Sequence, residues 1–203
     1  MGIKTAAWMK AAAAWFREAW TKRRKACRIQ RRVSDIRMDS EWLETDGLGG
    51  YASGTVGTIR TRRYHALRVT ATAPPTGRMV LVGGLEVSVH VAGSDEALTS
   101  QRYEPDVQHP RLAPLQAFAR DPWPTWTFAL SNGNVVRAEI LCTAGRARTI
   151  LRWTRLTGDG PLRLCVRPLL ATRDYHSLQR ENGAADLNLR LDGGCATWQL
   201  YSG

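Results

Sequence analysis

Hydrophobic and polar residues alternate with a period of two along most of the chain that follows residue 40. Leu85, Val87 and Val89 alternate with polar neighbours in this way. The same pattern recurs at residues 126–130, 136–142, 162–166 and 187–191. Because successive side chains of a strand point to opposite faces of a sheet, each segment predicts a β-strand with one buried and one solvated face.

The alternation also predicts which side chains are covered. It places Leu164 and Val166 on buried faces, together with the leucines at 187, 189 and 191. The same argument places Glu139 on a solvated face, between the apolar residues Ala138 and Ile140.

Turn signals separate the predicted strands. Asn132-Gly133-Asn134 is a hairpin signal, and Gly/Pro-rich turns occur at residues 74–77, 158–161 and 192–194. Between the strands there is no convincing helical pattern. Short strands with turns at regular intervals are typical of antiparallel sheets. We therefore predict an all-β fold, a large antiparallel β-sandwich that spans residues 38–203.

The first part of the chain has a different pattern. Residues 4–32 predict a helix, with an alanine block at 11–14 and a stripe formed by Trp8, Trp15 and Ala19. This basic extension, residues 1–37, is open to three interpretations. It is an amphipathic helix for a membrane surface or a partner, a nucleic-acid-binding arm, or an upstream extension unrelated to the fold. We favour the third interpretation, with Met38 as a plausible true start.

The charge is concentrated in that leading segment. The chain has a net charge of +11, of which residues 1–33 carry +9 and residues 34–203 carry +2. A strongly basic protein suggests a nucleic-acid partner, but the body of this chain is close to neutral. We therefore expect no nucleic acid to bind the body.

The remaining composition argues against several classes of protein. The four cysteines are widely separated and form no C-x-x-C pair, so we expect reduced, mostly buried thiols and no metal site or other cofactor. No apolar run approaches the roughly 20 residues of a membrane span, so we expect no transmembrane segment. These features favour a cytoplasmic protein.

A glycine-rich segment lies on the N-terminal side of the predicted strands. Residues 46–54 contain Asp46 and four glycines, which let a backbone approach a neighbour closely. Gly47-x-Gly49-x-x-Ala52 matches the loose dinucleotide pattern, but no β-branched strand precedes it and no amphipathic helix follows it. Two interpretations stay open: a tight structural loop at the sandwich edge, or a loop that lines a pocket.

Two similar clusters lie far apart at the ends of strands. Residues 62–65 read Arg-Arg-Tyr-His, and residues 173–176 read Arg-Asp-Tyr-His. Arginine donors, tyrosine faces and histidine suit a polyhydroxyl ligand, although they would equally suit a phosphate or a salt-bridged strand end. An isolated histidine is usually structural, but two such clusters favour convergence on one site.

Three motifs together resemble the N-terminal domain of the bacterial and archaeal glycogen debranching enzyme family (amylo-α-1,6-glucosidase). The family pattern is E-W-L-x-T-N-G-L-G-G-Y, then T-R-R-Y-H-G-L, then R-P-L-x-x-x-R-D-x-H. Residues 41–51 match with Asp46 in place of Asn, residues 61–67 match with Ala66 in place of Gly, and residues 167–176 match in full. The resemblance covers about four fifths of the chain.

The resemblance implies a supersandwich-like β-domain that packs against a C-terminal (α/α)-barrel. In the family, the barrel hydrolyses α-1,6-linked glucose at the branch stubs of glycogen or limit dextrin. Both catalytic carboxylates would belong to the barrel. We therefore assign no catalytic residue here and expect the chain alone to be inactive. The expected partners are an α-glucan, such as glycogen or a maltooligosaccharide, and the barrel. The residues implied to lie near the sugar are Arg62, Arg63, Tyr64, His65, Arg173, Asp174 and His176.

Two other functions remain open from the sequence. The chain could be a stand-alone α-glucan-binding module, or a basic interaction protein that acts through its N-terminal helix. Trp123 and Trp126 could form a stacking platform for a glucose ring, although tryptophan in a strand is more often part of the core.

Overall fold

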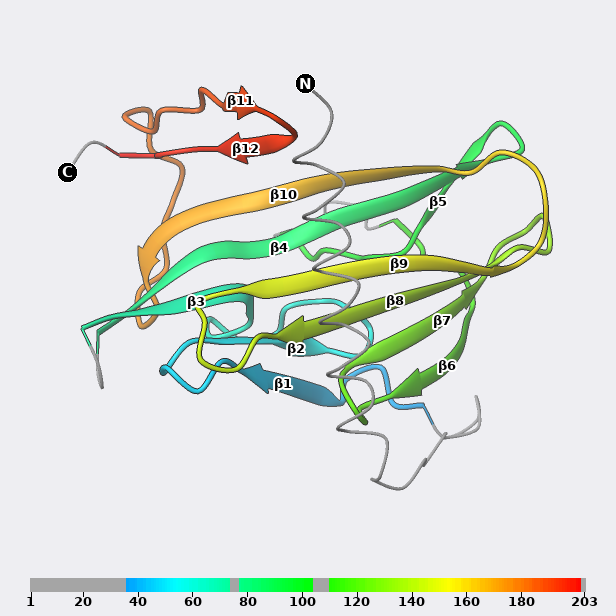
Figure 1. Ribbon diagram of the computed structural model, residues 1–203, viewed down its shortest axis with the longest axis horizontal. Helices are drawn as coiled ribbons and strands as arrows, with labels where there is room; N and C mark the ends of the chain where they lie inside the picture. The colour runs from blue at the N-terminus through cyan, green and yellow to red at the C-terminus, as the bar shows by residue number, and fades with distance from the viewer. Residues whose placement is uncertain (1–35, 74–76, 104–109, 202–203) are drawn as a thin grey trace. The chain divides into compact units, whose positions relative to one another are not determined.

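The computed structural model describes residues 36–73, 77–103 and 110–201 (Figure 1). The predicted N-terminal helix and the domain boundary near residue 37 therefore remain predictions, since residues 1–35 lie outside the described part. All regular structure in the described residues is β-strand, which confirms the predicted fold class. These residues divide into two compact units, which meet in sequence at residue 180.

The larger unit contains two antiparallel sheets. In the first sheet the strand order is β1-β2-β3-β4-β10, and β5 also pairs with β4. The strands of this sheet are β1 (Glu41–Thr45), β2 (Tyr51–Thr55), β3 (Ala66–Ala73), β4 (Gly77–Val91), β5 (Ser94–Ala97) and β10 (Arg163–Asp174). The order places β10, which is distant in sequence, directly beside β4.

The second sheet is a simple meander. Its order is β6-β7-β8-β9, so each strand pairs with the next in sequence. The strands are β6 (Leu115–Ala119), β7 (Thr125–Ala129), β8 (Val135–Cys142) and β9 (Thr149–Thr157). The predicted hairpin joins β7 to β8, where Gly133 has a φ of 82° and donates its amide to Leu130 O. In the other unit, β11 (Arg190–Asp192) pairs with β12 (Cys195–Thr197).

The main core lies between the two sheets, which face each other (Figure 1). Trp42 of β1 and Trp126 of β7 meet edge to face, with ring centroids 5.6 Å apart. Their indole N–H groups donate to Thr55 O at 3.1 Å and to Val56 O at 2.8 Å. A buried tryptophan thus contributes a large apolar surface without leaving its donor unpaired. This packing confirms the sandwich.

The tryptophans proposed as a stacking platform are part of this interior. Trp123 is 1% exposed and Trp126 is 3% exposed, so neither can stack on a sugar ring. Trp123 Nε1 donates to Glu139 Oε1 at 3.2 Å. The platform hypothesis is therefore wrong, because the neighbouring strands cover both rings.

A smaller core lies on the opposite face of the first sheet. Ala52 packs into the main core, so Tyr51, its neighbour in β2, points to the other side. There Tyr51 packs against a buried cluster of Ala66, Val69 and Val80. Tyr175 packs against the same cluster. The first sheet is therefore covered on both faces in this region.

Three burial predictions are wrong. Leu164 and Val166 are 40% and 42% exposed, because β10 is the last strand of its sheet within the described residues. Residues 187–189 are not in a strand, and Leu187 and Leu191 are 79% and 78% exposed. Glu139 is only 3% exposed, because Trp123 donates to it and Arg152 Nε lies 3.7 Å from its Oε2.

Cysteine burial also differs from the prediction. Cys142 is buried, and burial raises the pKa of its thiol, but Cys165 and Cys195 are exposed. All three are free thiols, as expected. Within the described ranges there is no metal-binding group of His, Cys, Asp or Glu residues. The same ranges contain no helix that is long and apolar enough to cross a membrane.

Candidate functional site

The glycine-rich loop between β1 and β2 is organised by the buried side chain of Asp46. Asp46 is 1% exposed, and its Oδ1 accepts hydrogen bonds from the amides of Leu48 at 2.8 Å and Gly50 at 2.9 Å. Its Oδ2 lies 3.1 Å from Nη1 of Arg68, which is also buried. The loop amides that could cradle a phosphate are therefore bonded to a carboxylate of the chain itself.

The glycines of this loop have local structural causes. Gly47 and Gly49 have φ values of 76° and 91°, in the left-handed region that favours glycine. A Cβ at Gly50 would lie 2.3 Å from Asp46 Oδ2 and 2.7 Å from Val69 O. The loop joins two antiparallel strands rather than a strand and a helix, so the dinucleotide interpretation does not fit.

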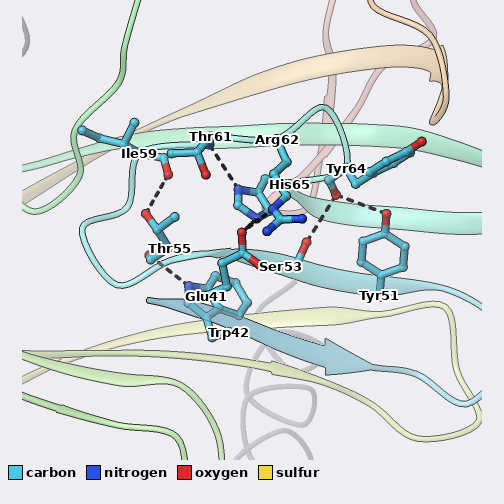
Figure 2. Close-up of polar contacts among 10 residues, drawn as sticks. All are labelled: Glu41, Trp42, Tyr51, Ser53, Thr55, Ile59, Thr61, Arg62, Tyr64 and His65. Atoms are coloured by element: carbon cyan, nitrogen blue, oxygen red, sulfur yellow. Dashed lines mark hydrogen bonds and ion pairs between the residues drawn. The ribbon is translucent and has the colours of Figure 1, made fainter. Parts of the chain in front are cut away.

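His65 is buried at the entry to β3 and faces Glu41. The Thr61 amide donates to His65 Nδ1 at 3.2 Å, so the ring proton of neutral His65 is on Nε2. This Nε2 lies 3.5 Å from Glu41 Oε1, which also accepts a 2.5 Å bond from Arg62 Nε. Figure 2 shows Glu41 extending toward both side chains. Burial lowers the pKa of His65, so the ring stays neutral near pH 7.

The two Tyr-His segments meet in space, as predicted from the sequence. The Tyr64 hydroxyl lies 3.2 Å from His176 Nδ1, across 112 positions of sequence. The Tyr64 ring centroid is 5.5 Å from that of Tyr175, and the Tyr175 centroid is 3.9 Å from that of His176. The Tyr–His cluster, as we call it, consists of Arg63, Tyr64, Arg173, Asp174, Tyr175 and His176.

The arginines of this cluster bind backbone carbonyls. Arg63 Nη1 donates to His176 O at 2.9 Å, and Arg173 Nη2 donates to Arg63 O at 2.6 Å. Arg173 Nη1 also donates to Ser177 O at 2.6 Å. Partial burial lowers the pKa of Arg173. Asp174 Oδ1 accepts from the His176 amide at 2.8 Å, which closes the turn after β10.

Arg78 connects the glycine loop to the Tyr–His cluster. Its Nε donates to Gly49 O at 2.7 Å, and its Nη1 donates to the Tyr175 hydroxyl at 3.3 Å. Its guanidinium carbon also lies 5.4 Å from the centroid of the Tyr175 ring. No sequence motif contains Arg78, so the sequence did not predict it as a site residue. Tyr175 belongs to the second Tyr-His segment in the sequence, but it occupies a variable position of the third motif and was not among the residues implied to lie near the sugar.

A groove of about 840 Å³ opens over the outer face of β1 and β2. Its floor includes Glu41, Leu43 and Thr45 of β1 and Tyr51 and Ser53 of β2. The side chains around it come from Arg62, Tyr64, His65, Arg78 and Arg120, and Trp42 and the loop glycines 47, 49 and 50 complete the lining.

The Tyr51 hydroxyl and Ser53 Oγ both donate to Tyr64 O, at 3.1 and 3.3 Å (Figure 2). These two bonds fix the floor of the groove to the segment that carries Tyr64. The predicted site residues are thus divided between two places. Arg62 and His65 line the groove, whereas Arg63, Arg173, Asp174 and His176 belong to the adjoining cluster. Tyr64 belongs to both.

Comparison with known proteins gives one match. The family model described as glycogen debranching enzyme N terminal matches residues 40–203. No curated protein and no solved structure matches the chain.

Proposed function

Because this chain belongs to the glycogen debranching enzyme N-terminal family, we propose that it is the substrate-side domain of a debranching enzyme. That enzyme would hydrolyse α-1,6-glucosidic branch stubs in glycogen or limit dextrin. The domain would contact the α-glucan through the surface formed by the groove and the Tyr–His cluster.

The observation that carries this proposal is the convergence of all three motifs. The glycine loop, the segment at 62–65 and the segment at 173–176 are joined by Arg78 and by the pair Tyr64 and His176. The pairing of β10 with β4 brings these distant segments together, and their convergence supports a shared role in one site. Guanidinium, phenol, imidazole and hydroxyl groups around one hollow suit a ligand that presents many hydroxyls.

The chemistry of hydrolysis supports a catalytic domain elsewhere. Glycoside hydrolysis needs two carboxylates, one as an acid for the leaving oxygen and one as a base or nucleophile. Among the described residues that line the groove, Glu41 is the one carboxylate, and it is bound by Arg62 and His65. We therefore assign the catalytic pair to a C-terminal (α/α)-barrel and expect this chain alone to be inactive.

We also propose a cytoplasmic location and no cofactor. The free thiols of Cys142, Cys165 and Cys195 suit a reducing compartment, where such groups stay reduced.

Calorimetric titration of the full chain with maltoheptaose tests the contact with α-glucan. We expect saturable binding, and no binding of cellohexaose, in which β-linkages give the chain a different shape. Absence of maltoheptaose binding would contradict the proposed contact.

A stand-alone α-glucan-binding module is the second candidate. It is favoured by the fact that the groove and the Tyr–His cluster are built from residues of this chain. Reading the gene past the codon for Gly203 separates the two candidates. A frame that continues into a long helical region rich in Trp, Asp and Glu supports the enzyme domain, whereas a stop with nothing related beyond it supports the module.

A further inference from the structure

We propose that the α-glucan chain lies in the groove over β1 and β2, in contact with Glu41, Leu43, Tyr51 and Arg78. The sequence predicted none of these four as a binding residue. The proposal rests on the proposed function and adds to it a location and a division of roles. Arg63 and Arg173 are positioning residues, which hold the side of the groove and do not touch the sugar.

The first argument is the composition of the groove floor. Leu43 and Ser53 are paired across β1 and β2, so both point to the outer face, and Thr45 and Tyr51 form the next such pair. Leu43 is 60% exposed in the middle of a strand. A leucine between a tyrosine ring and hydroxyl groups presents an apolar strip with polar borders. A glucose ring has the same division, with C–H groups on its faces and hydroxyls around its edge.

The second argument is the arrangement of charged groups around that floor. Glu41 and Arg62, held together by their 2.5 Å bond, offer an acceptor and a donor side by side. Arg78 is fixed to Gly49 O and to the Tyr175 hydroxyl by two of the five donors that a guanidinium carries. Both ends of the apolar strip therefore carry groups that can bind hydroxyls, and their positions are set before a ligand arrives.

The third argument is that the other predicted residues have internal partners. Arg173 donates to Arg63 O and Ser177 O, and Arg63 donates to His176 O. None of these residues lines the groove as the structure describes it. Their bonds fix the backbone on either side of Tyr64, whose ring does line the groove. Their effect on a ligand therefore passes through Tyr64.

A protein surface is the competing occupant, because Leu43 and Tyr64 both line the groove and are 60% and 40% exposed. The groove favours the glucan because it is concave and because hydroxyl, carboxylate and guanidinium groups surround a narrow apolar strip. An interface core for a protein domain is instead depleted in carboxylates, whereas Glu41 lies at this groove.

The test compares two leucines that are both exposed. Leu43→Asp places a charge in the groove, and Leu191→Asp places the same charge on the β11–β12 hairpin, where Leu191 is 78% exposed. Each full-length variant is titrated with maltoheptaose by calorimetry, and circular dichroism checks folding. We expect Leu43→Asp to weaken binding by about tenfold or more, and Leu191→Asp to leave the dissociation constant unchanged.

Arg78→Lys provides a second measurement that does not depend on Leu43. Lysine keeps the charge but loses the planar fork that joins Gly49 O to Tyr175, so affinity should fall while the charge of the groove is unchanged. If Leu43→Asp does not fold, Leu43→Ser replaces it and is expected to weaken binding in the same direction.

The outcomes separate this inference from the proposed function. If the unmodified chain binds maltoheptaose and the variants at Leu43 and Arg78 bind equally well, the groove assignment is wrong and the proposed function stands. If the unmodified chain does not bind maltoheptaose, the glucan contact itself fails, and the groove assignment fails with it. Normal glucan binding by Leu43→Asp, combined with loss of association with the barrel, would overturn the assignment in favour of protein docking.

Discussion

The two faces of the first sheet use similar strands for different purposes. On the inner face, Trp42 and Ala52 pack against the second sheet in a continuous apolar core. On the outer face, a small core of Ala66, Val69 and Val80 supports a layer of arginine, tyrosine and histidine side chains. The inner face holds the two sheets together, whereas the outer face fixes polar groups in position.

The polar layer is held mainly by bonds from side chains to backbone carbonyls. Arg63, Arg78 and Arg173 each donate to at least one carbonyl of another segment. Such bonds lock rotamers and join loops that contribute little apolar packing, which is how a site on loops acquires a defined geometry. We therefore expect substitutions on the inner face mainly to lower the free energy of unfolding, and substitutions on the outer face mainly to weaken ligand binding.

Trp126→Ala should give the largest effect on stability. It removes a ring that contacts Trp42 and Phe118 and leaves a cavity between the sheets, so we expect a loss of about 3–5 kcal/mol in the free energy of unfolding. Urea unfolding of the full chain measures this. Trp126→Phe is the matched control and should lose less, because an aromatic ring remains. Equal stability of Trp126→Ala and the unmodified chain would contradict the placement of this core.

Asp46→Ala should be the next most destabilising change, at about 3 kcal/mol, because it leaves the buried guanidinium of Arg68 without its carboxylate. It also removes the acceptor for the amides of Leu48 and Gly50. The same urea experiment applies. The double variant Asp46→Ala, Arg68→Met should recover part of the loss, since no buried charge then remains. A double variant less stable than Asp46→Ala would show that the pair does not act in this way.

Arg173→Gln should have a smaller effect on stability, about 1–2 kcal/mol, and a larger effect on binding. The variant loses the hydrogen bond from the Arg173 side chain of β10 to Arg63 O, so the backbone next to Tyr64 is no longer fixed in position. Maltoheptaose titration and urea unfolding are measured together. Arg163→Gln, at the other end of β10, is the control and should change neither value. A lower free energy of unfolding with an unchanged affinity for maltoheptaose would show that Arg173 does not position the binding site.

The smallest expected effect is a pH dependence from His65. Burial, the largest cause, lowers the pKa of His65 in the folded chain, and the charges of Arg62 and Arg60 act in the same direction, whereas Glu41 opposes them. The unfolded chain therefore binds a proton first as the pH falls below about 6.5. Stability is fully present above that pH and decreases as the pH falls toward the folded pKa.

Urea midpoints measured from about pH 7.5 to about pH 5 should show this decrease. The variant His65→Gln should show a flatter profile over the same range. Carboxylates with a lowered pKa, such as Glu86, contribute only at more acidic pH, because their unfolded pKa is near 4.5. A His65→Gln profile as steep as that of the unmodified chain would assign the effect to other groups.

The local pattern of apolar, polar and turn-forming residues was sufficient to predict several strands and turns of the fold. The alternation around Val87 and Val136 predicted β4 and β8, and Asn132-Gly133-Asn134 predicted the turn between β7 and β8. Strand periodicity and turn chemistry depend on neighbouring residues, so they can be recognised without the rest of the chain. Alternation shows which residues share a face, but not whether another layer covers that face. Leu164 and Glu139 were therefore placed wrongly.

For the candidate site, the sequence supplied the two Tyr-His segments and the glycine loop, together with the family to which they belong. The sequence could not identify Arg78, which lies in β4 outside every motif. Nor could it show that Arg62 and Arg63 occupy different places in the structure. These adjacent arginines have the same chemistry, yet one lines the groove and the other binds a backbone carbonyl.

The sequence by itself determined the strands β4, β7, β8 and β10, the hairpin turn between β7 and β8 and the residue types available to a site, because each depends on local geometry or on composition. The tertiary structure decided which of these residues meet. The sheet order β2-β3-β4-β10 brings residues 62–65 beside residues 173–176. Pairing between strands that are distant in sequence is set by the packing of the whole sheet, and no local pattern encodes it.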